Sequence, residues 1–129
     1  MGASVTEPDS TWPGKRSGKY NNRKVRADGY TFDSKAEHRR YCELKLMERA
    51  GEIEHLRVHT RWELLAAFRR NDGKWQRAIT YEDDFDYVEI ATGAFVIEDV
   101  KGARTQVFQL KEKLFRANYP DFDFRIVEA

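Results

Sequence analysis

The chain contains one strongly apolar run that ends in charged residues, Ala94-Phe95-Val96-Ile97-Glu98-Asp99-Val100-Lys101. Aromatic and β-branched residues dominate the first half of this run, which indicates a buried and central β-strand. Side chains alternate between the two faces of a strand, so Asp99 and Lys101 are expected on the same face. A carboxylate and an ammonium at the end of a buried strand are costly to desolvate unless they are paired or belong to a site.

A hairpin partner is expected directly before this strand. Residues 91–93 form a turn signal, and residues 84–90 supply the preceding strand. Counting outward from this turn brings Asp84 to the level of Asp99 and Lys101. The hairpin is therefore expected to bring these three side chains together.

Local signals define two helices. Ser34 and Glu37 match the Ser-x-x-Glu capping box, which predicts a helix over residues 35–50. Thr105 is expected as the N-cap of a second helix that ends before Pro120. The apolar face of this second helix is expected to comprise Val107, Leu110 and Leu114, with Phe108 and Phe115 beside them.

Turn signals separate the remaining strands. Asp28-Gly29 predicts a short hairpin within residues 20–32, and Asn71-Asp72-Gly73 predicts a second one. Further strands are expected at residues 53–58, 62–69, 74–81 and 122–127. The order of helix, several antiparallel strands, helix and strand predicts an α/β fold of the mixed α+β kind, with helices flanking a mixed sheet.

Length and composition are compatible with one folded domain. The 129 residues are expected to divide into a flexible tail over residues 1–18 and a single domain over residues 19–129. No apolar run approaches the roughly 18 residues of a membrane helix, so no membrane partner is expected. Cys42 is the only cysteine, which excludes an intrachain disulfide and a Cys-rich metal site. A cytoplasmic location is the simplest expectation.

Charge is distributed unevenly along the chain, although the net charge is only +1. Residues 15–26 carry lysine and arginine with no acidic residue, whereas residues 82–89 are rich in aspartate and glutamate. This combination suits a nucleic-acid enzyme, because cations hold phosphates and carboxylates hold a metal. An ordinary mixed-charge surface is equally compatible with the charges alone.

Two carboxylates and a lysine at one place suit metal-dependent hydrolysis of a phosphodiester. Asp84 and Asp99 offer hard oxygen ligands for Mg²⁺, which Mn²⁺ could replace, and the backbone carbonyl of Val100 could add another. Lys101 could orient the attacking water or stabilise charge on the phosphate. The alternative is a surface ion pair between Asp99 and Lys101, which contributes only about 0–1 kcal/mol.

The chain resembles the PD-(D/E)XK nuclease superfamily in Glu37, in Asp84-Phe85 and in Asp99-Val100-Lys101 followed by Gly102. More narrowly, it is similar to a small phage- and prophage-encoded family within that superfamily, long described as a domain of unknown function. The matching stretches are Tyr20-Asn21-Asn22-Arg23-Lys24, Ser34-Lys35-Ala36-Glu37, Asp84-Phe85 and Glu98-Asp99-Val100-Lys101-Gly102-Ala103-Arg104-Thr105.

The resemblance implies a restriction-endonuclease-like αβββαβ core and a Mg²⁺-dependent deoxyribonuclease activity. In such a nuclease, Asp84, Asp99 and Glu37 would hold the metal, and Lys101 would assist the attacking water. Glu37 also has a structural explanation as the capping-box glutamate, and this alternative stays open.

Other residues compete for the ligand role. Asp83 stands where the superfamily name has a proline, which leaves Asp83 and Asp86 as rivals to Asp84. His55 and His59 are placed on a strand or link, where a spacing of four does not build a helical metal pair. No cysteine or third histidine supports a zinc site, so none is expected.

The partner implied by the resemblance is DNA, either double-stranded or branched, in phage recombination, genome processing or host interference. Arg23, Lys24, Arg26 and Lys111 are the candidate contacts to its backbone. For Lys111 the alternative is a surface lysine whose stem packs on apolar neighbours. A homodimer would let both strands be cut, and no sequence feature decides this. The alternative function is a non-catalytic DNA-binding or phage interaction module that retains the fold.

Overall fold

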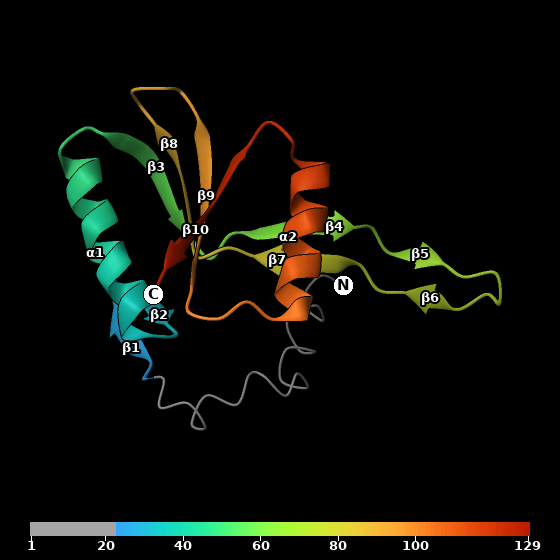
Figure 1. Ribbon diagram of the computed structural model, residues 1–129. Coiled ribbons are helices and arrows are strands. Elements are labelled where there is room, and N and C mark those ends of the chain that lie inside the picture. Colours follow the sequence, from blue (N-terminus) through green and yellow to red (C-terminus); the bar gives the residue numbers. More distant parts are fainter. Residues whose placement is uncertain (1–22) are drawn as a thin grey trace.

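A computed structural model describes residues 23–129 of the chain (Figure 1). The expected tail at residues 1–18 therefore lies outside the described residues. The helices are α1, Lys35–Arg49, and α2, Gln106–Asn118. In chain order the strands are β1 Val25–Ala27, β2 Tyr30–Phe32, β3 Ile53–Val58, β4 Arg61–Leu65, β5 Phe68–Arg69, β6 Trp75–Gln76, β7 Ile79–Glu82, β8 Phe85–Glu89, β9 Phe95–Lys101 and β10 Asp123–Glu128.

The main sheet has four strands in the order β10-β9-β8-β3. Strand β9, the apolar run of the sequence, lies inside this sheet, as predicted. It pairs antiparallel with β8, where Phe85 lies opposite Glu98, and parallel with β10, where Ile126 lies opposite Asp99. The sheet is therefore mixed, and the prediction of a mixed α+β fold is confirmed.

Two apolar cores lie on opposite faces of the sheet, because neighbouring residues of β9 point in opposite directions. Val96 packs in a cluster with Tyr41 and Leu44 of α1. Ile97 packs in the other cluster, with Phe115 of α2 and other aromatic side chains. Figure 1 shows the two helices on either side of the strands.

The apolar face expected for α2 was only partly right. Phe108 and Phe115 are buried against the sheet, and Leu114 packs beside them. Val107 and Leu110, which were expected on the inner face, are instead exposed. A helix buries one stripe of its surface, and here the stripe with the large aromatic rings faces the core because it removes more apolar area from water.

Local turn and capping signals give the expected structures. Asp28 and Gly29 have φ angles of 53° and 83°, the left-handed conformations that a tight hairpin turn requires. Ser34 and Thr105 cap α1 and α2, each with its hydroxyl oxygen accepting a backbone N–H three residues on. Helix α1 ends at Arg49, one residue before the expected end.

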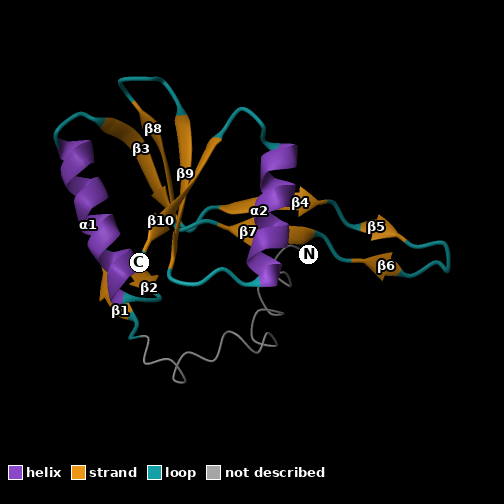
Figure 2. Cartoon of the chain, in the orientation of Figure 1, coloured by secondary structure: helices purple, strands orange, loops and turns teal. Residues whose placement is uncertain are grey.

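The segment between β3 and β8 forms a long two-stranded ribbon (Figure 2). Strand β4 pairs with β7, and β5 pairs with β6 farther out. The sequence predicts one continuous strand on each side, over residues 62–69 and 74–81. Each is divided in two, at residues 66–67 and at residues 77–78.

Helix α1 is joined to the sheet by a buried ion pair. Arg40 donates two hydrogen bonds to the Glu98 carboxylate, from Nε at 2.8 Å and from Nη2 at 2.7 Å. The hydroxyl of Tyr87 donates to the same carboxylate. The Glu98 side chain is only 1% exposed, so these donors replace its lost water. None of the helices within residues 23–129 is long and apolar enough to cross a membrane.

Replacing Arg40 by alanine leaves the Glu98 carboxylate buried without its cation. We expect this to lower the free energy of unfolding by about 3 kcal/mol or more, the usual cost of breaking a buried pair. Urea denaturation followed by circular dichroism measures the loss. The control Arg39→Ala, on the exposed side of α1, should change stability by less than about 0.5 kcal/mol. Equal stability of the two variants would show that the pair does not hold α1 in place.

Candidate active site

The ends of three strands and the start of one helix meet at one edge of the main sheet. Val58, the last residue of β3, lies opposite Phe85, the first residue of β8. Phe85 in turn lies opposite Glu98 in β9. Antiparallel pairing therefore brings the residues after β3, before β8 and late in β9 to the same level.

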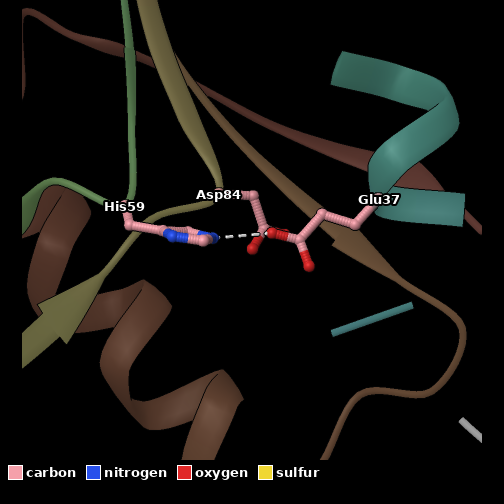
Figure 3. Close-up of side chains that lie close together, drawn as sticks. All are labelled: Glu37, His59 and Asp84. Carbon is pink, nitrogen blue, oxygen red and sulfur yellow. Dashed lines mark hydrogen bonds and ion pairs between the residues drawn. The ribbon is translucent and has the colours of Figure 1, made fainter. Parts of the chain in front are cut away.

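Three ligand-type side chains converge there, namely Glu37, His59 and Asp84 (Figure 3). One carboxylate oxygen from each acid and one imidazole nitrogen all lie within 4.8 Å of one another. Glu37 is buried, and His59 and Asp84 are half-buried. Glu37 lies on α1, His59 follows β3 and Asp84 precedes β8, so the cluster is a product of the tertiary fold.

Glu37 uses its two carboxylate oxygens in different ways. Its Oε1 accepts a hydrogen bond of 2.9 Å from the backbone N–H of Asp33, just before the N-cap. Its backbone N–H donates to Oγ of Ser34 at 3.1 Å. Its Oε2 lies 2.8 Å from Nε2 of His59. The capping role and a position in the cluster, given as alternatives from the sequence, therefore coexist.

His59 is the member of the cluster that was not predicted from the sequence. It follows directly after β3, and its backbone has a left-handed φ of 59°. Its N–H donates to the carbonyl of Asp84 at 3.2 Å, which joins the two residues through the main chain. The hydrogen bond to Glu37 raises the pKa of His59, while burial acts in the opposite direction. The sequence feature that could have indicated a site residue here is the position of His59 directly after the strand over residues 53–58. Its spacing from His55 carries no such information.

Asp84 sits at the level predicted from the hairpin. Its Oδ2 accepts the backbone N–H of Val100 at 2.6 Å, and its own N–H donates to the carbonyl of Glu98 at 3.1 Å. Burial, followed by the charges of Asp99 and Glu37, raises the pKa of Asp84 well above its ordinary value. Negative charge is thus crowded around this carboxyl, a condition that a bound cation would relieve.

Asp99 and Lys101 lie beside the cluster on one face of β9, as alternation predicted. Oδ1 of Asp99 lies 3.5 Å from Nζ of Lys101, and Oδ2 accepts the hydroxyl of Tyr81. Within residues 23–129, Asp99 Oδ1 has no hydrogen-bond partner. Burial raises the pKa of Asp99 and the Lys101 charge partly offsets this. Nζ of Lys101 is also 4.6 Å from the centre of the Phe108 ring.

The two rival aspartates make their polar contacts elsewhere, and within residues 23–129 the buried Oδ2 of Asp86 has no hydrogen-bond partner. Asp83 accepts hydrogen bonds from the backbone N–H of Thr60 at 2.9 Å and from Nε1 of Trp62 at 3.0 Å. Asp86 pairs with Arg57, whose Nε lies 2.7 Å from Oδ1. Neither belongs to the cluster of Glu37, His59 and Asp84. Burial and the neighbouring Asp86 raise the pKa of Asp83 to about 9.

The predicted DNA contacts fall on two separate elements. Arg23, Lys24 and Arg26 are exposed at the β1–β2 hairpin, where Lys24 pairs with Asp33 at 3.1 Å. Lys111 is half-buried on α2.

Comparison with known protein families identifies one match. The model of a family described as "Protein of unknown function (DUF1064)" matches residues 17–129, and the chain belongs to this family. No curated protein and no solved structure gives a significant match. The predicted membership of a family of unknown function is thereby confirmed, while the wider superfamily and the phage origin stay predictions.

Asp83→Asn should make stability less dependent on pH. With a folded pKa near 9 and an ordinary value of 3.8, the folded chain binds more protons than the unfolded chain between these limits. Protonated Asp83 therefore stabilises the folded chain fully below the unfolded pKa. This contribution to the free energy of unfolding is lost as pH rises toward 9, at up to about 1.4 kcal/mol per pH unit. The asparagine side chain does not titrate, so this contribution to the pH dependence is absent from the variant. Urea denaturation in EDTA between about pH 6 and pH 8 should show a shallower slope for the variant.

The exposed Asp121→Asn is the matched control, because it removes one carboxylate from the surface. It should keep the slope of the parent chain. If Asp83→Asn also kept that slope, Asp83 would not hold a proton in the folded chain at neutral pH.

Proposed function

We propose that this member of the DUF1064 family is a metal-dependent deoxyribonuclease. The observation that carries the proposal is the convergence of Glu37, His59 and Asp84 beside the Asp99–Lys101 pair at one edge of the sheet. Hydrolysis of a phosphodiester uses a metal ion and a positive charge that neutralises the phosphate. The ligand groups and the Lys101 ammonium lie side by side and suit these two roles.

The donor set fits a hard divalent cation. Carboxylate oxygens from Glu37 and Asp84 suit Mg²⁺, and the imidazole of His59 makes Mn²⁺ a good substitute. Asp99, whose Oδ1 lacks a hydrogen-bond partner within residues 23–129, is a further candidate ligand. When bound, the cation would polarise the phosphate and lower the pKa of a water molecule.

The residues of the chain supply the rest of the chemistry. The Lys101 side chain is 33% exposed, so its ammonium can reach a phosphate oxygen or orient a water molecule. Its contact with the Phe108 ring restricts where the ammonium lies. The hydroxyl of Tyr81 holds the Asp99 carboxylate from the other side, so this acid has a fixed orientation.

The arrangement of elements around the main sheet supports the PD-(D/E)XK proposal. The chain passes through α1, β3, β8, β9, α2 and β10 in that order, with the ribbon inserted between β3 and β8. Leaving the ribbon aside, this order corresponds to the αβββαβ core that the resemblance implies. The choice of DNA over RNA, and work in phage recombination, processing or host interference, rest on the resemblance.

A cleavage assay on supercoiled, linear, single-stranded and four-way-junction DNA tests the proposal. We expect cutting with Mg²⁺ or Mn²⁺ and none with EDTA. Asp84→Asn should abolish cutting, and Lys101→Met should slow it by about 100-fold or more, as for loss of a charge-stabilising donor. Both variants should bind DNA and stay folded by circular dichroism.

Lys45→Met on α1 is the matched control for Lys101→Met, because Lys45 pairs with Glu48 away from the cluster. It should cut like the parent chain. If Asp84→Asn cut at the parent rate, the cluster would not be an active site. DNA binding with no metal-dependent cutting of any substrate would favour the non-catalytic module.

A further inference from the structure

The ribbon is inserted between two members of the cluster. His59 immediately precedes it and Asp84 immediately follows it, so residues 60–83 form one insertion that leaves the site and returns to it. The hydrogen bond between the His59 N–H and the Asp84 carbonyl, at 3.2 Å, closes its base. The ribbon therefore begins at the site itself, and Figure 2 shows its outer part extending away from the rest of the chain.

The base of the ribbon is fixed to the body of the protein. Leu64 and Tyr81 are buried in the core formed with α2. Asn118 donates from Nδ2 to the carbonyl of Leu64 at 2.8 Å, and the Tyr119 hydroxyl donates to the carbonyl of Glu63 at 2.9 Å. These contacts set the direction in which the ribbon leaves the site.

The outer part of the ribbon, residues 66–78, has the opposite character. Every residue from 66 to 77 is exposed. Phe68 is 46% exposed and Trp75 is 63% exposed, so two large aromatic side chains face water. Aromatic rings at such positions are typical of surfaces that contact a partner.

This outer part is also strongly basic. It contains Arg69, Arg70, Lys74 and Arg77 against Asp72 alone, a net charge of +3 in a chain whose total is +1. The Arg69 guanidinium lies 4.9 Å from the centre of the Trp75 ring. Arg70 pairs with Asp72 at 2.7 Å, whereas Lys74 and Arg77 form no ion pair with any other part of residues 23–129. Cations alternating with exposed rings are suited to a nucleic acid.

We propose that residues 66–78 are an arm that binds duplex DNA, and that double-stranded DNA is the substrate class of the site. This inference rests on the proposed function. A two-stranded ribbon fits the major groove of DNA, which is about 12 Å wide. From Arg61 to Asn71 the ribbon spans at most roughly 33 Å at 3.3 Å per residue. This upper limit is close to one helical turn of about 34–36 Å, so a duplex bound at the cluster lies within reach of the arm.

A second copy of the chain is the rival partner for this arm. Like charges oppose such an arrangement, because two arms of +3 each would repel one another. A polyanion instead gains both the electrostatic attraction and contact with the exposed rings. Charge therefore favours DNA over pairing between the arms of two copies.

The test is the salt dependence of binding by the Lys74→Ala/Arg77→Ala variant, measured by fluorescence anisotropy. The probe is a duplex of about three helical turns, in EDTA, so that no cutting occurs. The slope of log K against log salt should become shallower by about 1.8, or 0.9 for each lost phosphate contact. Affinity at physiological salt should fall by about tenfold or more.

The control is Lys45→Ala/Arg49→Ala, which removes two positive charges from α1 and should keep the slope of the parent chain. Because Asp84→Asn should lose cutting but keep this slope, failure of the proposed function and failure of the arm give different results. An unchanged slope for the arm variant would overturn the inference. So would an equal loss on single-stranded DNA, or a fall in molecular mass by light scattering, which would assign the arm to self-association.

Discussion

The register between β8 and β9 is the constraint on which the rest of this structure depends. With Phe85 opposite Glu98, the buried Glu98 faces Arg40 on α1, and its neighbour Asp99 faces Lys101 and Tyr81 on the other side. A slip of β9 by one residue would exchange its two faces, so Glu98 would lose Arg40 and Tyr87, and Asp99 would lose Tyr81. Desolvation of these acids therefore specifies the register, and the register in turn brings Asp84 to the site.

Local signals in the sequence predicted most of the main-sheet elements and the level of Asp84, because turns, caps and alternation act over a few residues. The features that it missed depend on contacts between distant segments. His59 joins Glu37 because the end of β3 lies opposite the start of β8. The local sequence shows that a strand ends at Val58 but not which other segments meet it there. The exposed Leu110 is of the same kind, since the packing of α2 on the sheet decides which of its faces is buried.

Glu37 shows how a local signal can serve a distant site. Its contact with the N–H of Asp33, just before the N-cap, sets which way the side chain points. The remaining oxygen is then directed at His59 without further support. Preorganisation of this kind lowers the entropy that a ligand group must lose when it binds a metal. The fold thus uses a helix-start signal to hold one member of a tertiary cluster.

The closed base of the ribbon has an evolutionary consequence. Because His59 and Asp84 are held together through their main chains and the base of the ribbon packs on α2, residues can be gained or lost in the outer part, residues 66–78, without displacing either side chain. Exposed hairpin tips are also the places where insertions and deletions are best tolerated. Homologous chains can therefore differ in the length and composition of the outer ribbon while keeping the same cluster. Selection can then act on the ribbon and on the cluster separately.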